Sequence, residues 1–332
     1  MDDWKQVALE MRAVPYNITR IMKKTGQTEY EIRKLFKEDD LRKWKEKIDA
    51  ADQKKQDAEG EEKQLPNKAR KKFVALQNLI PVEYTREWKG NPIITFGLIG
   101  DTHINSKYTQ LTYLHRFYDI CAERGIKDVY HTGDVDDGER MRPGHQYECY
   151  TQGAGDHIRE ILRVYPKREG MTTHFITGNH DASIYKHVGL DIGESIALNR
   201  DDLHYLGRDA AKIEVAPNCV LELRHPWDGT AYATSYKPQK LIEGMESDSK
   251  PNILAIGHYH KCEYLFHRNV HCFQTLCFQS QTPFTRGKGI YVSMGGWIVT
   301  IEVDDKGYVQ RIIPELIAFY KMIENDYLNW RE

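Results

Sequence analysis

The chain has few cysteines, no long apolar run and almost no net charge, and each of these absences narrows what it can be. Its six cysteines include no Cys-x-x-Cys pair, so we expect reduced and mostly buried thiols. No apolar stretch approaches the ~20 residues that a membrane span needs. The acidic start Met1-Asp2-Asp3-Trp4 is unlike a secretory signal. We therefore expect a cytoplasmic protein with no membrane partner.

The charge balance also argues against a strong global attraction to polyanions. A formal net charge of −2 over 332 residues gives no overall pull toward nucleic acid or acidic lipid, although a local basic patch is compatible with it. Hydrophobic residues make up 40% of the chain, which is enough for a core. The length suits one large domain with a small one.

Apolar residues at helical spacing predict three short helices in a small all-α domain over residues 1–45. Gly26 suits a helix C-cap, and Thr28 with Glu31 suits a capping box at the start of the third helix. A glycine-containing turn before a third helix is typical of a helix-turn-helix. The candidate DNA contacts on that helix are Thr28, Tyr30, Arg33, Lys34 and Lys37. Its acidic residues would repel phosphate, so dimerisation or protein docking remains an alternative.

Charged residues dominate the next segment, residues 46–90, which we interpret as a helical extension and solvated linker. From residue 91 to 332 the pattern changes to short apolar strands alternating with helices, and later mostly to strands. This order predicts an α/β fold in which two packed sheets have helices outside, an αββα sandwich. The expected helices are 111–123 and 157–164, and the expected strands are 93–99, 129–132, 173–177, 212–215, 220–223, 253–256, 270–275, 289–294 and 297–303.

Five short polar segments each follow one of these predicted strands. They are Gly100-Asp101-Thr102-His103, Gly133-Asp134-Val135-Asp136-Asp137, Gly178-Asn179-His180-Asp181, Leu223-Arg224-His225 and Gly257-His258-Tyr259-His260. A single short match of this kind is more often a turn than a metal site. The ordered series, with every member at a strand end, is not expected by chance.

Together these segments offer the ligands of a two-metal site. Hard divalent ions take carboxylate oxygens and imidazole nitrogens, and one carboxylate must bridge the pair. Asp134 follows a strand and a glycine, so it is the natural bridge. Because His225 also ends a strand, we prefer it as a ligand to His204, His267 and His271. The candidate metal ligands are Asp101, His103, Asp134, Asn179, His225, His258 and His260.

This series of segments resembles the calcineurin-like metallophosphoesterase superfamily. That family shows Asp-x-His, Gly-Asp-x-x-Asp, Gly-Asn-His-Asp or Glu, an isolated His and Gly-His-x-His, in the order found here over roughly residues 93–305. The arrangement is similar to the DNA-repair-exonuclease branch found in phages and mobile elements. The resemblance is specific for fold and metal site but not for substrate.

The resemblance implies a first metal held by Asp101, His103, Asp134 and His260, and a second held by Asp134, Asn179, His225 and His258. It also implies in-line attack on phosphorus by a metal-bridging hydroxide. His180 would protonate the leaving oxygen, Asp181 would orient that imidazole, and Asp137 would support its loop. Mn²⁺ is the favoured metal, with Fe²⁺, Zn²⁺, Mg²⁺ and Ni²⁺ as alternatives.

A polar and aromatic segment over residues 138–155 is expected to border this site. Its candidate substrate contacts are Arg140 and Arg142, which could bind phosphate, and Tyr147, whose ring could stack on a base. A plain surface loop is the alternative. A second candidate border is the segment 278–289, which could equally be a turn that packs the second sheet.

Three functions fit these observations. The favoured one is a phosphodiesterase acting on DNA, with the N-terminal helices contacting nucleic acid. The second is a phosphatase or phosphodiesterase for small nucleotides or phosphoproteins, with those helices as a docking or dimerisation module. The third is a non-enzymatic scaffold, which an intact Asn179-His180-Asp181 segment argues against. A homodimer and an ATPase or other protein partner remain open.

Overall fold

The computed structural model describes residues 4–5, 8, 18–28, 31–32, 35, 82–85, 88–246 and 250–331. The chain separates into two compact units, Met1–Asn78 and Leu79–Glu332. Among the residues described, no helix is both long and apolar enough to cross a membrane.

The first unit contains α2 (Ile18–Thr25), and its end has the geometry expected from the sequence. Gly26 has a φ of 70° and donates its N–H to the carbonyl of Met22 at 2.8 Å. Such a left-handed residue is the usual way to close a helix.

The turn that follows is a capping box. The backbone N–H of Thr28 donates to the carboxylate of Glu31 at 2.9 Å, and the N–H of Glu31 donates to the Thr28 hydroxyl at 3.3 Å. Buried Ala8 and Ile32 form a small apolar cluster packed by Trp4, Met22 and Leu35. Of the candidate DNA contacts only Thr28 is described; Tyr30, Arg33, Lys34 and Lys37 lie outside the described residues.

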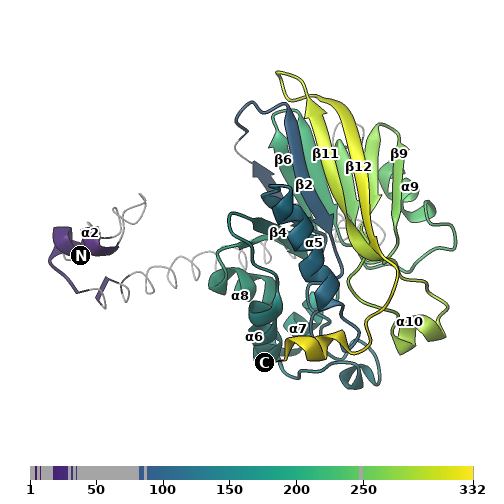
Figure 1. The fold of residues 1–332 in the computed structure, drawn as a ribbon, viewed down its shortest axis with the longest axis horizontal. Helices are drawn as coiled ribbons and strands as arrows, with labels where there is room; N and C mark the ends of the chain where they lie inside the picture. Colours follow the sequence, from purple (N-terminus) through teal and green to yellow (C-terminus); the bar gives the residue numbers. More distant parts are fainter. Residues whose placement is uncertain are drawn as a thin grey trace, which may run out of the picture. The chain divides into compact units, whose positions relative to one another are not determined.

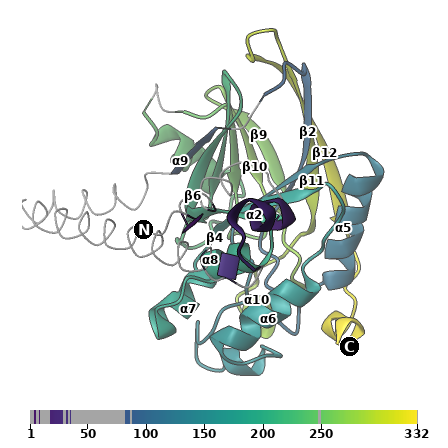
Figure 2. The same cartoon turned by 90° about the vertical axis from the view of Figure 1, so that its left-hand side faces the viewer.

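The second unit is built on two sheets of six strands each (Figures 1 and 2). The first sheet has the strand order β12 (Val309–Phe319), β11 (Met294–Val303), β2 (Ile93–Ile99), β3 (Asp128–His131), β4 (Thr172–Thr177) and β5 (Leu203–Arg208). The second has the order β1 (Val82–Thr85), β6 (Ala210–Ala216), β7 (Cys219–Arg224), β8 (Ile253–Ile256), β10 (Val270–Gln274) and β9 (Glu263–His267).

Alternation along each strand explains the layers, because successive side chains point to opposite faces of a sheet. In β8, Ile253 and Ala255 face the first sheet and pack with Leu98 of β2, within the apolar core between the sheets. Leu254 and Ile256 face the other way, toward α9 (Tyr236–Glu243). One strand thus contributes to two apolar layers.

Helices cover the outer face of the first sheet. They are α5 (Leu111–Glu123), α6 (Ala154–Val164), α7 (Asp181–Val188) and α8 (Ile192–Asn199), whose buried apolar residues share one cluster with those of β3 and β4. With α9 on the second sheet, the order of layers is helix, sheet, sheet, helix. The αββα sandwich predicted from the sequence is therefore confirmed, and α5 has the bounds expected for it.

Besides β5 and β9, which were not among the expected strands, two local expectations after residue 288 differ from the structure. Residues 289–293 are not a strand, because Ile290 donates its N–H to Thr285 and Ser293 donates to His260, in place of pairing with a neighbouring strand. The edge strand β12 was not expected. It contains Pro314, which lacks an N–H and is tolerated in a sheet because β12 has a neighbour on one side only.

The second unit also includes part of the segment interpreted as a linker. Residues 82–85 form β1, which pairs in parallel with β6. The two-sheet structure therefore begins before residue 91.

Candidate metal centre

The candidate ligands lie where strands of both sheets end. β2, β3 and β4 are parallel neighbours in one sheet, as are β7 and β8 in the other. Each of the five polar segments lies at the carboxyl end of one of these strands. Because the carboxyl ends of parallel strands meet at one edge, residues far apart in the chain are brought together there.

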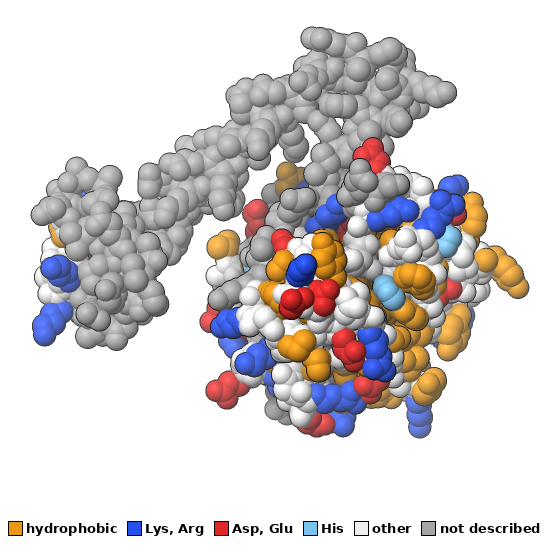
Figure 3. All heavy atoms as spheres, turned by 90° about the horizontal axis from the view of Figure 1, so that it is seen from above, with side chains coloured by type: hydrophobic (Ala, Val, Ile, Leu, Met, Phe, Trp, Pro, Cys, Tyr) orange, Lys and Arg blue, Asp and Glu red, His pale blue; other side chains and the backbone are white. Residues whose placement is uncertain are grey.

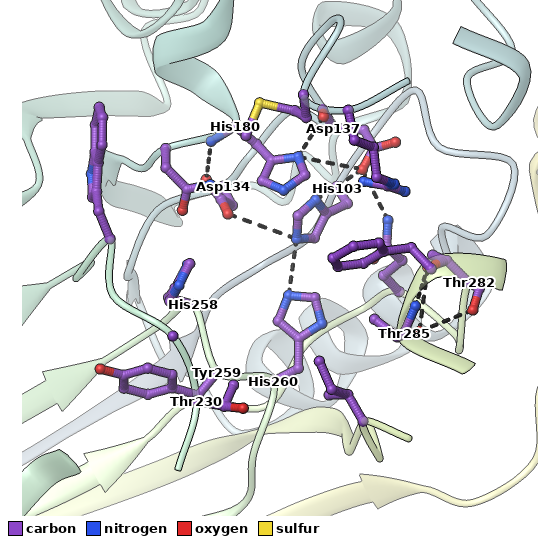
Figure 4. Close-up of a pocket in the computed structure, with 18 of the residues that line it drawn as sticks. His103, Asp134, Asp137, His180, Thr230, His258, Tyr259, His260, Thr282 and Thr285 are labelled. Atoms are coloured by element: carbon purple, nitrogen blue, oxygen red, sulfur yellow. Dashed lines mark hydrogen bonds and ion pairs between the residues drawn. The ribbon is translucent and has the colours of Figure 1, made fainter. Parts of the chain in front are cut away.

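The first group of ligand atoms comes from Asp101, His103 and His260. The two imidazole Nε2 atoms of His103 and His260 are 3.0 Å apart (Figure 4). Nε2 of His260 lies 3.4 Å from the Asp101 carboxylate, and Nε2 of His103 lies 3.9 Å from that of Asp134. Converging lone pairs at these separations can share one cation.

The second group comes from Asp134, His225 and His258. Nε2 of His225 is 3.1 Å from the Asp134 carboxylate and 3.1 Å from the side-chain oxygen of Asn179. Asp134 therefore lies between the two groups, in the position expected of a bridging carboxylate. The structure brings all seven candidate ligands together, while their binding of metal remains a prediction.

Glycines make room for these side chains. A Cβ added to Gly178 would lie 2.4 Å from Oδ1 of Asp134 and 2.6 Å from Nε2 of His225. A Cβ on Gly133 would lie 2.7 Å from Nδ1 of His225. These two glycines thus permit an approach that any other residue would block, which fits a site built around closely packed ligands.

The backbone of the ligands is also unusual. Positive φ angles occur at five of the seven candidate ligands, although few non-glycine residues adopt them. They are Asp101 at 51°, His103 at 44°, Asp134 at 55°, His258 at 76° and His260 at 54°. Such strain clusters at functional sites, where the surrounding structure imposes it.

Hydrogen bonds orient the imidazoles. Nδ1 of His225 donates to the carbonyl of Thr132 at 2.7 Å, and Nδ1 of His103 lies 3.0 Å from the Asp137 carboxylate. In both rings this leaves Nε2 to face the other ligands. Holding the second ring nitrogen in this way fixes the tautomer and raises the basicity of a metal-binding histidine.

The ionisation of the cluster suits metal ligands. Burial opposes the charge of Asp134, but His225 and then His180 hold its pKa well below the usual range. Burial likewise works against a charged His225, yet Asp134 raises its pKa to about 9. The carboxylates are therefore ionised, and His225 holds a proton that a bound cation would displace.

His180 lines the cavity in front of these groups, and its ring is held by an unexpected partner. Its Nδ1 donates to the backbone carbonyl of Asp137 at 2.6 Å. The expected orienting residue, Asp181, instead accepts backbone N–H groups from Gly178, Val135 and Asp136 at 2.8–3.2 Å. The role inferred for Asp181 is therefore corrected: it fixes the loops on either side of the site, because its carboxylate is occupied by their backbones.

A buried group behind the site was missed by sequence reasoning. The carboxylate of Asp137 contacts Nε2 of His145 at 3.1 Å, and the thiol of Cys149 donates to it at 3.7 Å. Gln279 donates to the same carboxylate at 3.0 Å. Of these residues, only Asp137 belongs to a motif that can be recognised in the sequence, Gly-Asp-x-x-Asp. His145, Cys149 and Gln279 lie in segments that contain no recognisable motif.

The cavity over the candidate ligands has a volume of about 460 Å³. Arg142 lines it, whereas Arg140 lies at a separate hollow with Gln146 and Gln152. Tyr147 is 75% exposed and is not among the residues lining this cavity. Of the three candidate substrate contacts, the structure thus places Arg142 alone at the site. Trp227, which was not proposed as a contact, also lines it, and so does Phe284 from the segment 278–289, which was considered as a second border of the site.

The three competing histidines lie elsewhere in the second unit. His204 contacts His174, His267 contacts Glu243, and His271 contacts Tyr264. None of them belongs to a group of candidate ligand atoms found among the described residues.

Comparison with known proteins gives distant structural likenesses. No protein-family model matches the chain, and no protein with a curated description matches it. A solved archaeal phosphodiesterase shares 12% identity with a TM-score of 0.38, over 68% of this chain and 100% of its own. Zinc-complexed Vps29 from Entamoeba histolytica shares 15% identity with a TM-score of 0.35, over 68% of this chain and 100% of its own.

A predicted phosphoesterase from Streptococcus pneumoniae is also similar, at 10% identity and a TM-score of 0.34, over 68% of this chain and 98% of its own. At these TM-scores the superpositions establish neither an activity nor a ligand. The functional conclusion therefore rests on the residues of the site.

Proposed function

We propose that the protein is a phosphodiesterase that uses two divalent metal ions, and that DNA is its substrate. The observation that carries this proposal is the position of Asp134 between two groups of ligand atoms. Asp101, His103, Asp134 and His260 would hold one ion, and Asp134, Asn179, His225 and His258 the other. Bound there, such ions supply charge neutralisation at phosphorus and an activated water. We favour Mn²⁺, which accepts this mixture of oxygen and nitrogen ligands.

His180 is the proposed acid for the leaving oxygen. Because its Nδ1 donates to a carbonyl, the other nitrogen, Nε2, must carry the proton that is transferred. Burial lowers the pKa of His180 to about 4, so the free ring is neutral near pH 7. A phosphate anion in the cavity would favour the protonated ring, which couples substrate binding to the acid function.

The cavity favours a diester over a monoester. Monoesters are dianions and call for a cationic clamp. Among the described residues lining the cavity, Arg142 is the one Lys or Arg, and its guanidinium is already paired with Glu148 at 2.6 Å. A singly charged phosphodiester needs fewer cationic side chains for binding than a dianionic monoester does.

The choice of DNA within this class rests on the N-terminal unit, whose capping box suits the start of a helix-turn-helix third helix. On the face of the molecule in Figure 3, basic side chains are interspersed with acidic ones. Binding through one local element therefore suits this chain better than a broad basic surface. The alternative is a small nucleotide or phosphoprotein substrate, with the N-terminal unit docking a partner.

The test is cleavage of end-labelled single- and double-stranded DNA by the purified protein with Mn²⁺. We expect metal-dependent cleavage that His180→Ala abolishes or strongly reduces. A phosphomonoester dye, assayed in parallel, distinguishes the alternative: hydrolysis of the dye with intact DNA would overturn the nuclease proposal. Full DNA cleavage by the His180→Ala protein would refute the role of His180.

A further inference from the structure

Two aromatic side chains line the cavity together with the candidate ligands. Trp227 follows His225 by two residues, and Phe284 belongs to the short helix α10 (Pro283–Gly287). The two side chains are 50% and 42% exposed, respectively. Ring surface is therefore available to a ligand that enters the cavity.

The two rings belong to different sides of the metal centre. The residue after Trp227 is Asp228, whose backbone carbonyl accepts a hydrogen bond from Nε2 of His258 at 2.8 Å. Trp227 therefore lies on the side of the cavity where the second ligand group is found. Figure 4 shows Thr282 and Thr285, which flank Phe284, on the other side of the His103–His260 pair from His258. A phosphate at the ligand groups would therefore have an aromatic ring on either side.

Each ring has a cation over it. The ammonium of Lys186 lies 4.6 Å from the centre of the Trp227 ring, and the guanidinium of Arg142 lies 4.5 Å from that of Phe284. Lys186 forms no ion pair with another described residue, so its charge is available to an anion. At Trp227 an aromatic ring thus lies next to a cation that can contact a phosphate, whereas the guanidinium at Phe284 is already paired with Glu148.

The Trp227 ring is also fixed in place. Its indole N–H donates to the carboxylate of Asp209 at 2.8 Å, and the backbone carbonyl of Asp209 in turn accepts the N–H of His225 at 2.7 Å. The ring is thus anchored to the same loop as a candidate ligand. A preorganised aromatic surface loses little freedom on binding.

We propose that Trp227 and Phe284 are a stacking platform for unpaired nucleobases on either side of the scissile phosphodiester. The substrate class is then single-stranded nucleic acid, because the bases of a duplex are stacked on one another. This inference rests on the phosphodiesterase function proposed above. Stacking of this kind is tolerant of sequence, since every base has a π face.

The first experiment compares two diesters that release the same 4-nitrophenolate with Mn²⁺: the 4-nitrophenyl ester of thymidine 5′-phosphate and methyl 4-nitrophenyl phosphate. The ratio of their kcat/KM values isolates the contribution of the nucleoside. Because each ester carries a nucleoside on one side of the phosphate only, we expect one of the two variants Trp227→Ala and Phe284→Ala to lower this ratio roughly ten-fold or more. If that residue is Trp227, Trp227→Phe should retain most of the ratio. Tyr308→Ala, which removes a 51% exposed ring on the turn before β12, serves as the matched control and should leave both rates unchanged.

The outcomes separate the two proposals. If the unsubstituted protein hydrolyses neither ester, the proposed phosphodiesterase function is refuted. Hydrolysis of both, with a ratio that neither alanine variant changes, would overturn the platform and leave the phosphodiesterase standing.

A second experiment tests the single-strand preference with labelled oligonucleotides. We expect a single strand to be cut faster than the same strand in a duplex, and an abasic site to suppress cleavage at the adjacent bonds. Equal rates on single strand and duplex would overturn the assignment of substrate class.

Discussion

The carboxylate of Asp137 lies 3.0 Å from Nδ1 of His103, while the backbone carbonyl of the same residue accepts Nδ1 of His180 at 2.6 Å. One residue thereby orients both a candidate metal ligand and the candidate acid. His103 and His180 also pack edge to face, with ring centres 4.6 Å apart. Burial opposes the charge of Asp137, but hydrogen bonds from His103 and His145 hold its pKa well below the usual range.

Asp137→Asn tests this relationship, because it removes the charge with little change in shape. An amide can no longer raise the basicity of His103, and losing such a partner typically costs 10–100-fold in metal affinity. We expect Mn²⁺ affinity to fall by about that factor, as measured by isothermal titration calorimetry. Asp119→Asn on α5, whose carboxylate pairs with Arg168, is the matched control. Equal loss in both variants would show that the effect is not specific to His103.

Gly178→Ala tests the close packing of the ligands. The added Cβ would lie 2.4 Å from Oδ1 of Asp134 and 2.6 Å from Nε2 of His225, so either side chain must move. We expect a stability loss of about 1–3 kcal/mol in denaturant titrations, together with lower bound Mn²⁺. Gly155→Ala in α6 is the control, since the atom nearest to its added Cβ is 3.5 Å away. A Gly178→Ala protein with unchanged metal content would contradict the proposed crowding.

Metal removal should lower the stability of the second unit. A ligand that binds the folded state alone stabilises it by roughly 2.7 kcal/mol at a concentration 100 times its Kd. We therefore expect Mn²⁺ to raise the thermal midpoint and a chelator to reverse the rise. Asp134→Asn should abolish most of this response, because Asp134 lies between both ligand groups. A metal response that survives in this variant would place the binding site elsewhere.

Much of the site was predictable because its ligands are carried by short segments that begin where strands end. Asp101, Asp134 and His258 each follow a glycine and a run of β-forming residues, which is a signal that one sequence can show. The parallel strands then bring the segments to one edge without further information. The expected helix over 111–123 was equally accessible, since its apolar residues keep one period throughout.

The remainder depends on contacts between distant residues. Asp181 follows His180 directly, but its carboxylate contacts the backbone of the loop after β3, which adjacency in the sequence does not show. Phe284 reaches the cavity from a five-residue helix with too few turns to give a periodic pattern. The edge strand β12 was obscured by Pro314, whose presence argues against a central strand.

A buried ion pair next to the site predicts a pH-dependent stability. Nδ1 of His157, on α6, lies 2.7 Å from the carboxylate of Asp136, and its Nε2 lies 3.6 Å from that of Glu139. Burial alone would lower the pKa of His157, but Asp136, and to a lesser extent Glu139, raise it to about 9. An unfolded histidine titrates near ~6.5.

Because the folded pKa exceeds the unfolded one, this pair stabilises the fold fully below pH ~6.5. The contribution is then lost as the pH rises toward about 9. The upper bound for this loss is ~3 kcal/mol. Urea unfolding of the metal-free protein at several pH values measures it. In His157→Gln, which keeps a hydrogen-bonding side chain but cannot be charged, we expect this step to disappear. If the unsubstituted protein and His157→Gln lose stability in parallel over this pH range, the charge on His157 does not cause the loss. Another group must then carry the proton that the folded state retains.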